Sequence, residues 1–250
     1  MILYFVESSK EWLKNFFAVD VKNFLVSYFY EEKNNLIDHI LTNNPNANII
    51  LDSGAYTAMT QKQEIDLTKY MEYIKNNKSK FSNYFALDVI KNPEKSLENY
   101  NIMIENKLNP IPVFHVYEDF KYLEHYGKVA DYIAIGGLTT FKTKKRELIN
   151  FVENCISIIP KGKKIHLLGV SSFDVLMRFG GKIYSADSSS MNASMVYHSL
   201  IDFSGTTKHI QLKNMGKTTI DQVNERQKYL AKRYINLETQ INQYWRNRNG

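Results

Sequence analysis

The sequence is poor in cysteine and contains no long apolar run. Its 250 residues include one cysteine, Cys155, so a single chain can form neither an intramolecular disulfide nor a cysteine-based zinc site. No apolar run reaches the roughly 18 residues that a transmembrane helix needs. Met1–Val6 have no basic segment before them and no cleavage site after them. These absences predict a cytoplasmic protein without a membrane span.

The chain also lacks internal repeats, low-complexity blocks and Gly/Ser-rich linkers. We therefore expect one domain over residues 1–250, which is long enough to bury a substantial core. The charge balance is moderately basic, with 32 Lys and Arg against 26 Asp and Glu and a net charge of +6. That balance permits a polyanionic partner, but Lys-rich helix faces in water account for it equally well.

Short apolar runs alternate with amphipathic helical segments along most of the chain. Counted from Phe24, strands are expected at residues 24–30, 48–51, 84–87, 111–114, 132–135, 164–168, at the run ending in Asp187, and at 209–212. This alternation predicts an α/β fold of the (β/α)8 TIM-barrel type. Residues 1–6 and the first helix are expected as a short N-terminal addition, and residues 219–248 as a long C-terminal helix. A doubly wound sheet is the alternative.

Several of the predicted strands end in residues that can carry chemistry. These residues are Asp52-Ser53-Gly54, Asp88, His115, Gly136-Gly137 and Asp187. A parallel barrel brings the carboxyl ends of its strands to one rim, where such enzymes keep their active sites. The plainer interpretation is that each Asp caps the following helix and that the glycines only form helix-entry turns.

Two carboxylates at one rim, Asp52 and Asp187, suit displacement at a sugar carbon. One carboxylate attacks or stabilises the developing positive charge, and the other transfers protons. Glycines beside them would let a flat ligand approach the backbone closely. Tyr56 could stack on such a ligand or belong to the core.

The order of these motifs resembles a known family. It runs through Asp52-Ser-Gly-Ala-Tyr56, a strand ending in Asp88, Ile135-Gly-Gly-Leu138, His166-Leu-Leu-Gly-Val-Ser171 and a strand ending in Asp187. This order is similar to that of the queuine and archaeosine tRNA-guanine transglycosylases. Those enzymes are TIM barrels that exchange guanine for a 7-deazaguanine through a covalent sugar-aspartate intermediate.

The resemblance implies a role for each matching residue. Asp187 corresponds to the nucleophile that attacks the sugar C1′, and Asp52 to the residue that transfers protons. The implied base-binding residues are Ser53, Gly54, Tyr56, Asp88, His115, Gly136, Gly137 and Leu138. His115 stands where the family usually has a base-reading glutamine.

The sequence also departs from the family pattern. With one cysteine it cannot form the family's three-cysteine-plus-histidine zinc site. It has Asp-Ser-Gly-Ala-Tyr in place of Asp-Ser-Gly-Gly-Phe-Gln, and no Asp-Glu-Cys follows the third strand. The chain is shorter than the bacterial tRNA enzymes. These features indicate a reduced relative, similar to those that place deazaguanines in DNA in phages and their hosts.

Basic residues offer a surface for nucleic acid. Lys144, Lys145 and Arg146 follow the Gly-Gly strand, and Lys232 and Arg233 lie in the C-terminal helix. Such residues make phosphate contacts, although a solvated helix face has the same composition.

We therefore expect a transglycosylase that exchanges guanine in DNA or tRNA for a 7-deazaguanine base, with no metal or other cofactor. The target nucleotide would be extruded into the barrel mouth. Two alternatives remain: a hydrolase or transferase for free nucleosides or small sugars, and a barrel that binds nucleotides or nucleic acid without turnover. The sequence leaves open DNA versus tRNA, the incoming base and the oligomeric state.

Overall fold

A computed structural model describes residues 1–6, 9–141, 144–170, 172–188, 199–202, 208–211 and 219–249. The strands are β1 (Ile2–Val6), β2 (Asn23–Ser27), β3 (Asn48–Asp52), β4 (Asn83–Tyr84), β5 (Val113–His115), β6 (Tyr132–Gly136), β7 (Lys164–Leu167), β8 (Ser185–Ser188), β9 (Ser199–Asp202) and β10 (Lys208–Gln211).

The α-helices are α1 (Lys10–Phe17), α2 (Tyr28–Asn34), α3 (Leu36–Asn43), α4 (Ala55–Thr60), α5 (Leu67–Asn77), α6 (Pro93–Glu105), α7 (Phe120–Val129), α8 (Lys145–Ile158), α9 (Phe173–Phe179) and α11 (Ile220–Asn249). Two short 3-10 helices, η1 (Lys78–Lys80) and η2 (Leu138–Phe141), complete the elements.

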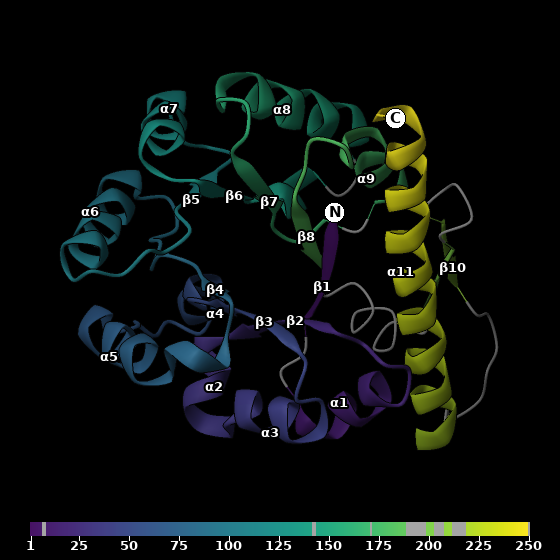
Figure 1. Cartoon of the computed structure of the whole chain (residues 1–250). Coiled ribbons are helices and arrows are strands. Elements are labelled where there is room, and N and C mark those ends of the chain that lie inside the picture. The colour runs from purple at the N-terminus through teal and green to yellow at the C-terminus, as the bar shows by residue number, and fades with distance from the viewer. Residues whose placement is uncertain are drawn as a thin grey trace.

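The eight strands β1–β8 form one parallel sheet that curls into a TIM-barrel-like fold, with helices around its outside (Figure 1). The strand order is β4-β3-β2-β1-β8-β7-β6-β5. One parallel bridge, between Phe85 just after β4 and Ile111 just before β5, joins the two edges of the sheet. This cyclic order confirms the predicted fold class, because a doubly wound sheet would reverse direction at a switch point.

Two strand assignments from the sequence were wrong. β1 is not an N-terminal addition, because it pairs with β2 on one side and with β8 on the other. Its unbroken apolar sequence suits a strand whose two faces are both covered. The eighth barrel strand was predicted at residues 209–212, but residues 209–211 belong to β10, which pairs antiparallel with β9 in a separate two-stranded sheet, and residue 212 lies outside the described residues.

Two helical boundaries also differ from expectation. Residues Tyr28–Tyr30 were predicted as the end of a strand, but they begin α2. The helix predicted near residues 191–200 lies mostly outside the described residues, and Ser199–Leu200 belong to β9.

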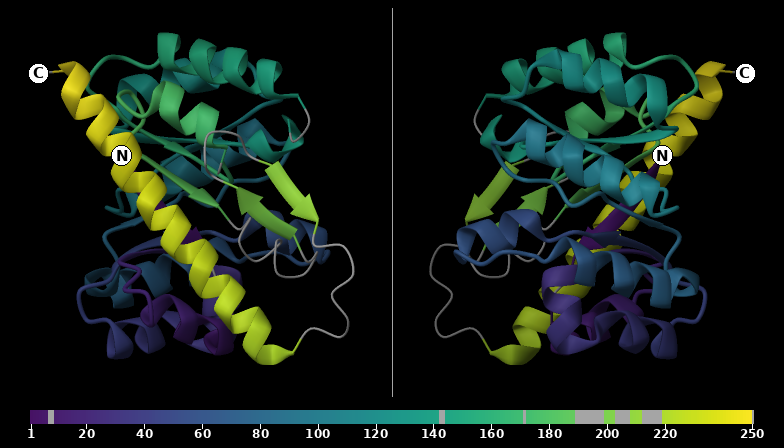
Figure 2. Two further views of the ribbon diagram at one scale, coloured as in Figure 1. Left: turned by 90° about the vertical axis from the view of Figure 1, so that its right-hand side faces the viewer. Right: turned by 90° about the vertical axis from the view of Figure 1, so that its left-hand side faces the viewer.

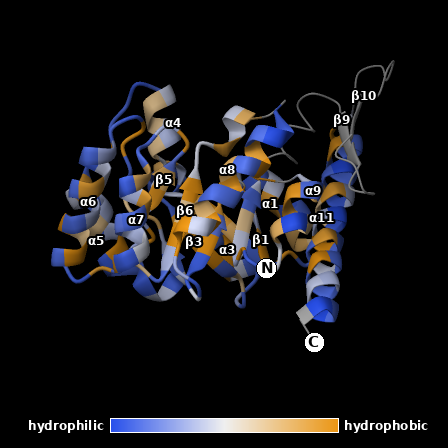
Figure 3. Cartoon of the chain, turned by 90° about the horizontal axis from the view of Figure 1, so that it is seen from above, coloured by the Kyte–Doolittle hydropathy of each residue, from blue (hydrophilic) through white to orange (hydrophobic). Residues whose placement is uncertain are grey.

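The described residues form two apolar cores. An outer core packs the helices against the sheet, and a smaller inner core fills the barrel with residues that include Tyr4, Leu25, Ile50 and Phe85. Seen from above, helices such as α5, α6 and α7 alternate between hydrophobic and hydrophilic colours (Figure 3), as expected for helices with one face on a core. The inner core fills the barrel interior beneath the carboxyl ends of its strands.

The long helix α11 crosses one side of the barrel diagonally (Figure 2) and holds β1 in place. The Glu238 carboxylate accepts a hydrogen bond from the Leu3 amide at 2.7 Å, and Asn242 bonds both the amino group and the carbonyl of Met1. Trp245 donates to the Met177 carbonyl in α9 at 2.9 Å. The C-terminal half of α11 therefore lies at the amino end of the barrel strands, away from the rim.

Candidate active site

Asp52 and Asp187 both face the inside of the barrel at its carboxyl rim. Asp187 pairs in register with Tyr4, an inner-core residue, and paired residues of parallel strands point to the same face. Asp52 follows Ile50 by two residues, so it shares the inward face of that inner-core residue. The two side chains predicted from the sequence therefore share the inward face of the barrel at its rim.

The Asp187 carboxylate is fixed by two donors. Its Oδ1 accepts from the backbone amide of Gly169 at 3.0 Å and contacts Nε2 of His166 at 3.1 Å. Gly169 adopts φ +74°, a conformation that glycine takes without strain, and this turn aims its amide at the carboxylate. Only 6 % of the Asp187 residue surface is exposed.

Asp52 occupies a different electrostatic environment. Burial, followed by the charges of Asp88 and Asp187, raises the pKa of its carboxyl to about 7. The Gly54 amide donates to Asp52 Oδ2 at 2.9 Å and opposes this rise. The residue keeps partial solvent access at the rim. A carboxyl with a pKa near 7 can exchange protons at neutral pH.

Gly54 is required by its surroundings. It has φ +82°, and an added Cβ would lie 2.6 Å from Ser27 Oγ and 2.7 Å from Phe29 Cβ. The tight turn places the Gly54 amide on Asp52 and starts α4 immediately afterwards. The Asp-Ser-Gly motif thus positions its own carboxylate.

Asp88 lies in a cluster of four polar side chains. Its Oδ1 accepts from the Ser53 hydroxyl at 2.9 Å, and its Oδ2 lies 3.1 Å from Nε2 of His115. The other ring nitrogen of His115, Nδ1, lies 3.1 Å from Glu118 Oε1. Glu118 also accepts from the His115 backbone amide at 3.1 Å. His115 therefore bridges two carboxylates.

The bridge keeps His115 positively charged. Burial alone would lower its pKa, but the hydrogen bonds to Asp88 and Glu118 raise it to about 10. Gly136 makes room for the ring, since a Cβ there would lie 2.8 Å from His115 Cδ2. The space beside Gly136, predicted from the sequence to admit a flat ligand, is thus filled by His115.

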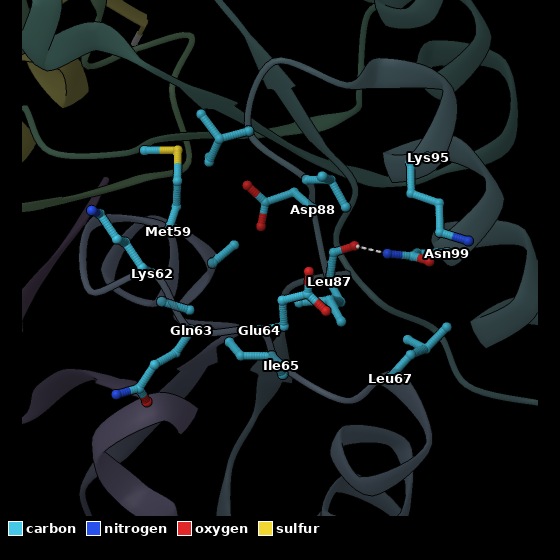
Figure 4. Close-up of a pocket in the computed structure, with 14 residues that line it drawn as sticks. Met59, Lys62, Gln63, Glu64, Ile65, Leu67, Leu87, Asp88, Lys95 and Asn99 are labelled. Atoms are coloured by element: carbon cyan, nitrogen blue, oxygen red, sulfur yellow. Dashed lines mark hydrogen bonds between the residues drawn. The ribbon is translucent and has the colours of Figure 1, made fainter.

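A cavity of about 630 Å³ opens beside Asp88. Figure 4 shows the Asp88 carboxylate pointing into it, with Met59 and Lys62 on one side and Lys95 on the other. Its walls come from α4 and the segment after it, from the residues after β4, and from α6. The volume is in the range of small-molecule sites.

The remaining predicted base-binding residues lie around the same rim. Tyr56 projects from α4 with 66 % of its surface exposed, so the alternative that it belongs to the core was wrong. Gly137 has φ +74°, and its Cβ side is covered by Val116. Leu138 is buried and begins η2.

The predicted nucleic-acid-binding residues differ in their solvent exposure and in whether they already form ion pairs. Lys144 and Lys145 are exposed but form ion pairs with Glu147 and Asp174. Arg146 is exposed near the start of α8. On α11, Lys232 is exposed, whereas Arg233 is half-buried.

Sequence reasoning assigned no role to three polar contributors to the site, Glu118, His166 and Ser185. Glu118 follows His115 by three residues, a spacing compatible with a turn that folds its carboxylate back. Ser185 contacts His166 behind Asp187. Polar residues inside otherwise apolar strands, as in Lys164-Ile-His-Leu and Ile183-Tyr-Ser-Ala, were the available signal.

Among the described residues, no group of three or more His, Cys, Asp or Glu side chains is arranged to hold a metal ion. No helix in the same part of the chain is long and apolar enough to cross a membrane. Comparison of the sequence with models of protein families and with curated proteins found no match.

Proposed function

We propose that this protein is a transglycosylase that exchanges guanine in DNA or tRNA for a 7-deazaguanine base. The observation that carries the proposal is the convergence of Asp52, Asp88 and Asp187 on one rim, each in a different environment. One carboxylate is held by two donors, one has a pKa near 7, and one is bridged to a cationic histidine. Base exchange at a sugar needs these three capacities: a nucleophile, a proton carrier and an acceptor for the base edge.

Asp187 is the proposed nucleophile. Its Oδ2 attacks C1′ of the extruded nucleotide, the C1′–N9 bond breaks, and the bonding electrons leave with guanine. The sugar is then held as an ester of Asp187. The incoming base attacks C1′, and the ester bond breaks to regenerate the carboxylate. The donors on Oδ1 hold the carboxylate in place through both displacements.

Asp52 is the proposed proton carrier. With a pKa of about 7, a substantial fraction of this carboxyl is protonated at neutral pH and can donate to the departing guanine. The resulting carboxylate then takes the proton from the ring nitrogen of the incoming base. The two steps return Asp52 to its starting state, so no external acid or base is consumed.

Asp88 is the proposed acceptor for the base edge. Guanine presents two donors there, N1–H and the exocyclic amine, and a carboxylate can accept both. Each Asp88 oxygen already accepts one hydrogen bond, and each has a further lone pair. The cavity beside Asp88 supplies space for a flat base. Tyr56, which does not line this cavity, offers an exposed aromatic ring on α4.

Covalent trapping tests this proposal. The protein is incubated with guanine-containing DNA or tRNA, with and without a 7-deazaguanine base, and the mixture is resolved under denaturing conditions. We expect an adduct that Asp187→Asn abolishes and that the matched surface variant Asp131→Asn retains, because the Asp131 side chain is almost fully exposed. Mass spectrometry of the recovered nucleosides identifies the polymer and the inserted base. Absence of both adduct and labelled-guanine exchange with either polymer would refute the transferase.

A nucleoside or small-sugar glycosidase is the second candidate, and one observation favours it. Lys144 and Lys145 are paired with acidic neighbours, which reduces the charge available for phosphates. In that case Lys232→Ala and Arg146→Ala would leave turnover of free guanosine unchanged. For the transglycosylase, the same changes weaken polymer binding and reduce its salt dependence.

A further inference from the structure

A line of polar side chains crosses the inside of the barrel and ends on Asp187. The Tyr132 hydroxyl lies 2.5 Å from Ser185 Oγ, and Ser185 Oγ lies 2.5 Å from Nδ1 of His166. Nε2 of the same ring lies 3.1 Å from Asp187 Oδ1. These residues come from β6, β7 and β8, so the line runs from the amino end of the barrel to its rim.

The centre of this line is sealed from solvent, and its two ends, Tyr132 and Asp187, are 8 % and 6 % exposed. His166 has no exposed surface, and neither has Ser185. The imidazole is surrounded by inner-core rings, with centroid distances of 5.2 Å to Phe85 and 6.1 Å to Tyr4. Because buried polar groups need partners, the hydrogens along the line have few possible arrangements.

Counting hydrogens selects one arrangement. The Asp187 carboxylate has no hydrogen to give, so Nε2 of His166 must carry one. If Nδ1 also carried a hydrogen, Ser185 would have to donate to Tyr132, and the Tyr132 hydroxyl would have no other acceptor among the described residues. If Nδ1 is bare, Tyr132 donates to Ser185, Ser185 to Nδ1, and Nε2 to Asp187. Each hydrogen is then used once.

From this geometry we infer that His166 is a positioning residue for Asp187, with its own tautomer held by Ser185 and Tyr132. The inference rests on the proposed function for its kinetic consequence. His166 and the Gly169 amide both bond Oδ1, and no described residue bonds Oδ2. The arrangement leaves Oδ2 as the oxygen presented to the sugar.

The hydrogen bond matters because an aspartate side chain rotates easily about its last torsion. Without a donor on Oδ1 other than a single backbone amide, the carboxylate would sample orientations that point neither oxygen at C1′. Misplacing a reacting group by about 1 Å can reduce a rate by about 100-fold. His166 itself touches neither sugar nor base.

A pair of substitutions tests the role. His166→Phe keeps a flat ring but removes the donor, whereas His166→Gln offers an amide N–H near the position of Nε2. We expect His166→Phe to lower the rate constant of adduct formation by about 100-fold at saturating nucleic acid, with the half-saturating concentration unchanged. His166→Gln should recover most of that loss. His125→Gln, a change outside the barrel interior, serves as the control.

A second measurement needs no substrate. Long-range ¹H–¹⁵N correlation spectra of the folded wild-type protein should show the His166 hydrogen on Nε2, and Ser185→Ala should weaken this preference. A hydrogen on Nδ1, or equal adduct rates in the Phe and Gln variants, would overturn the inference. Absence of adduct and exchange in every protein, with the hydrogen on Nε2, would instead refute the proposed reaction and leave the positioning of Asp187 supported.

Discussion

Replacing Asp52 with asparagine should stabilise the protein at neutral and alkaline pH. The pKa of Asp52 is raised from 3.8 to about 7, first by burial and then by the charges of Asp88 and Asp187. Because the folded-state pKa lies above the unfolded-state value, the fold favours the protonated carboxyl. The stability that the protonated Asp52 carboxyl contributes is fully present below about pH 3.8 and is lost as the pH rises through about 7. Asparagine keeps an oxygen for the Gly54 amide but never ionises.

The size of the effect follows from the pKa values. A difference of about 3 in pKa, at about 1.36 kcal/mol for each unit, corresponds to about 4 kcal/mol. Asp52 keeps partial solvent access, which screens its charge, so we expect a gain of about 2 to 4 kcal/mol at pH 8. For a domain of this size that gain raises Tm by roughly 4 to 16 °C. At pH 5 the gain should shrink to less than half.

Thermal and urea denaturation of wild type and Asp52→Asn at pH 5, 6, 7 and 8 measure this difference. Asp131→Asn is the control, because its exposed carboxylate pairs with Lys163 and gains nothing from neutralisation. A stability difference between wild type and Asp52→Asn that stays constant from pH 5 to pH 8 would show that the rim carboxylates do not interact as described.

Three further variants probe the rim. His115→Phe leaves two buried carboxylates without their shared cation. We expect it to lower the free energy of unfolding by about 3 to 5 kcal/mol in urea denaturation at pH 7. Since the pKa of His115 is raised from 6.5 to about 10, the stability difference between wild type and variant should decline as the pH rises through 10. Gly54→Ala should destabilise by about 1 to 3 kcal/mol more than Gly162→Ala, because both glycines have positive φ but only Gly54 lacks space for a Cβ. Tyr56→Ala should leave Tm unchanged and weaken nucleic-acid binding in fluorescence anisotropy, while Tyr56→Phe retains it; a large fall in Tm for Tyr56→Ala would contradict its exposed position.

The rim residues could be predicted from the sequence because parallel strands end at one edge. Asp52 and Asp187 each follow an apolar run, and that local pattern was enough to place both carboxylates at the barrel mouth. The identity of the eight strands was harder to obtain. The N-terminal run and residues 209–211 are both short segments that could form a strand, and only pairing with β8 or with β9 separates a barrel strand from a strand of the small antiparallel sheet.

The electrostatics of the site could not be predicted from local pattern. The pKa of Asp52 depends on burial and on the charges of Asp88, which follows β4, and Asp187 in β8. The pKa of His115 depends on its contacts with Asp88 and Glu118. Glu118 lies in a turn, where an acidic residue normally faces water, so its buried contact with His115 had no clear sequence signal. Tyr56 has an aromatic side chain of the kind that often packs in a core, and only its position on α4 shows that it is exposed.

The contacts between α11 and the start of the barrel join segments that are far apart in the sequence, and this separation affects when the barrel can close. β1 precedes the other barrel strands along the chain, but one of its neighbours is β8, the Leu3 amide in β1 donates to Glu238, and the carbonyl of the adjoining Met1 accepts from Asn242. The seam between β1 and β8 therefore stays open until β8 and α11 have been synthesised. Contacts of such long sequence separation slow folding and expose unpaired strand edges. During that interval the edge of β1 that later pairs with β8 remains unpaired.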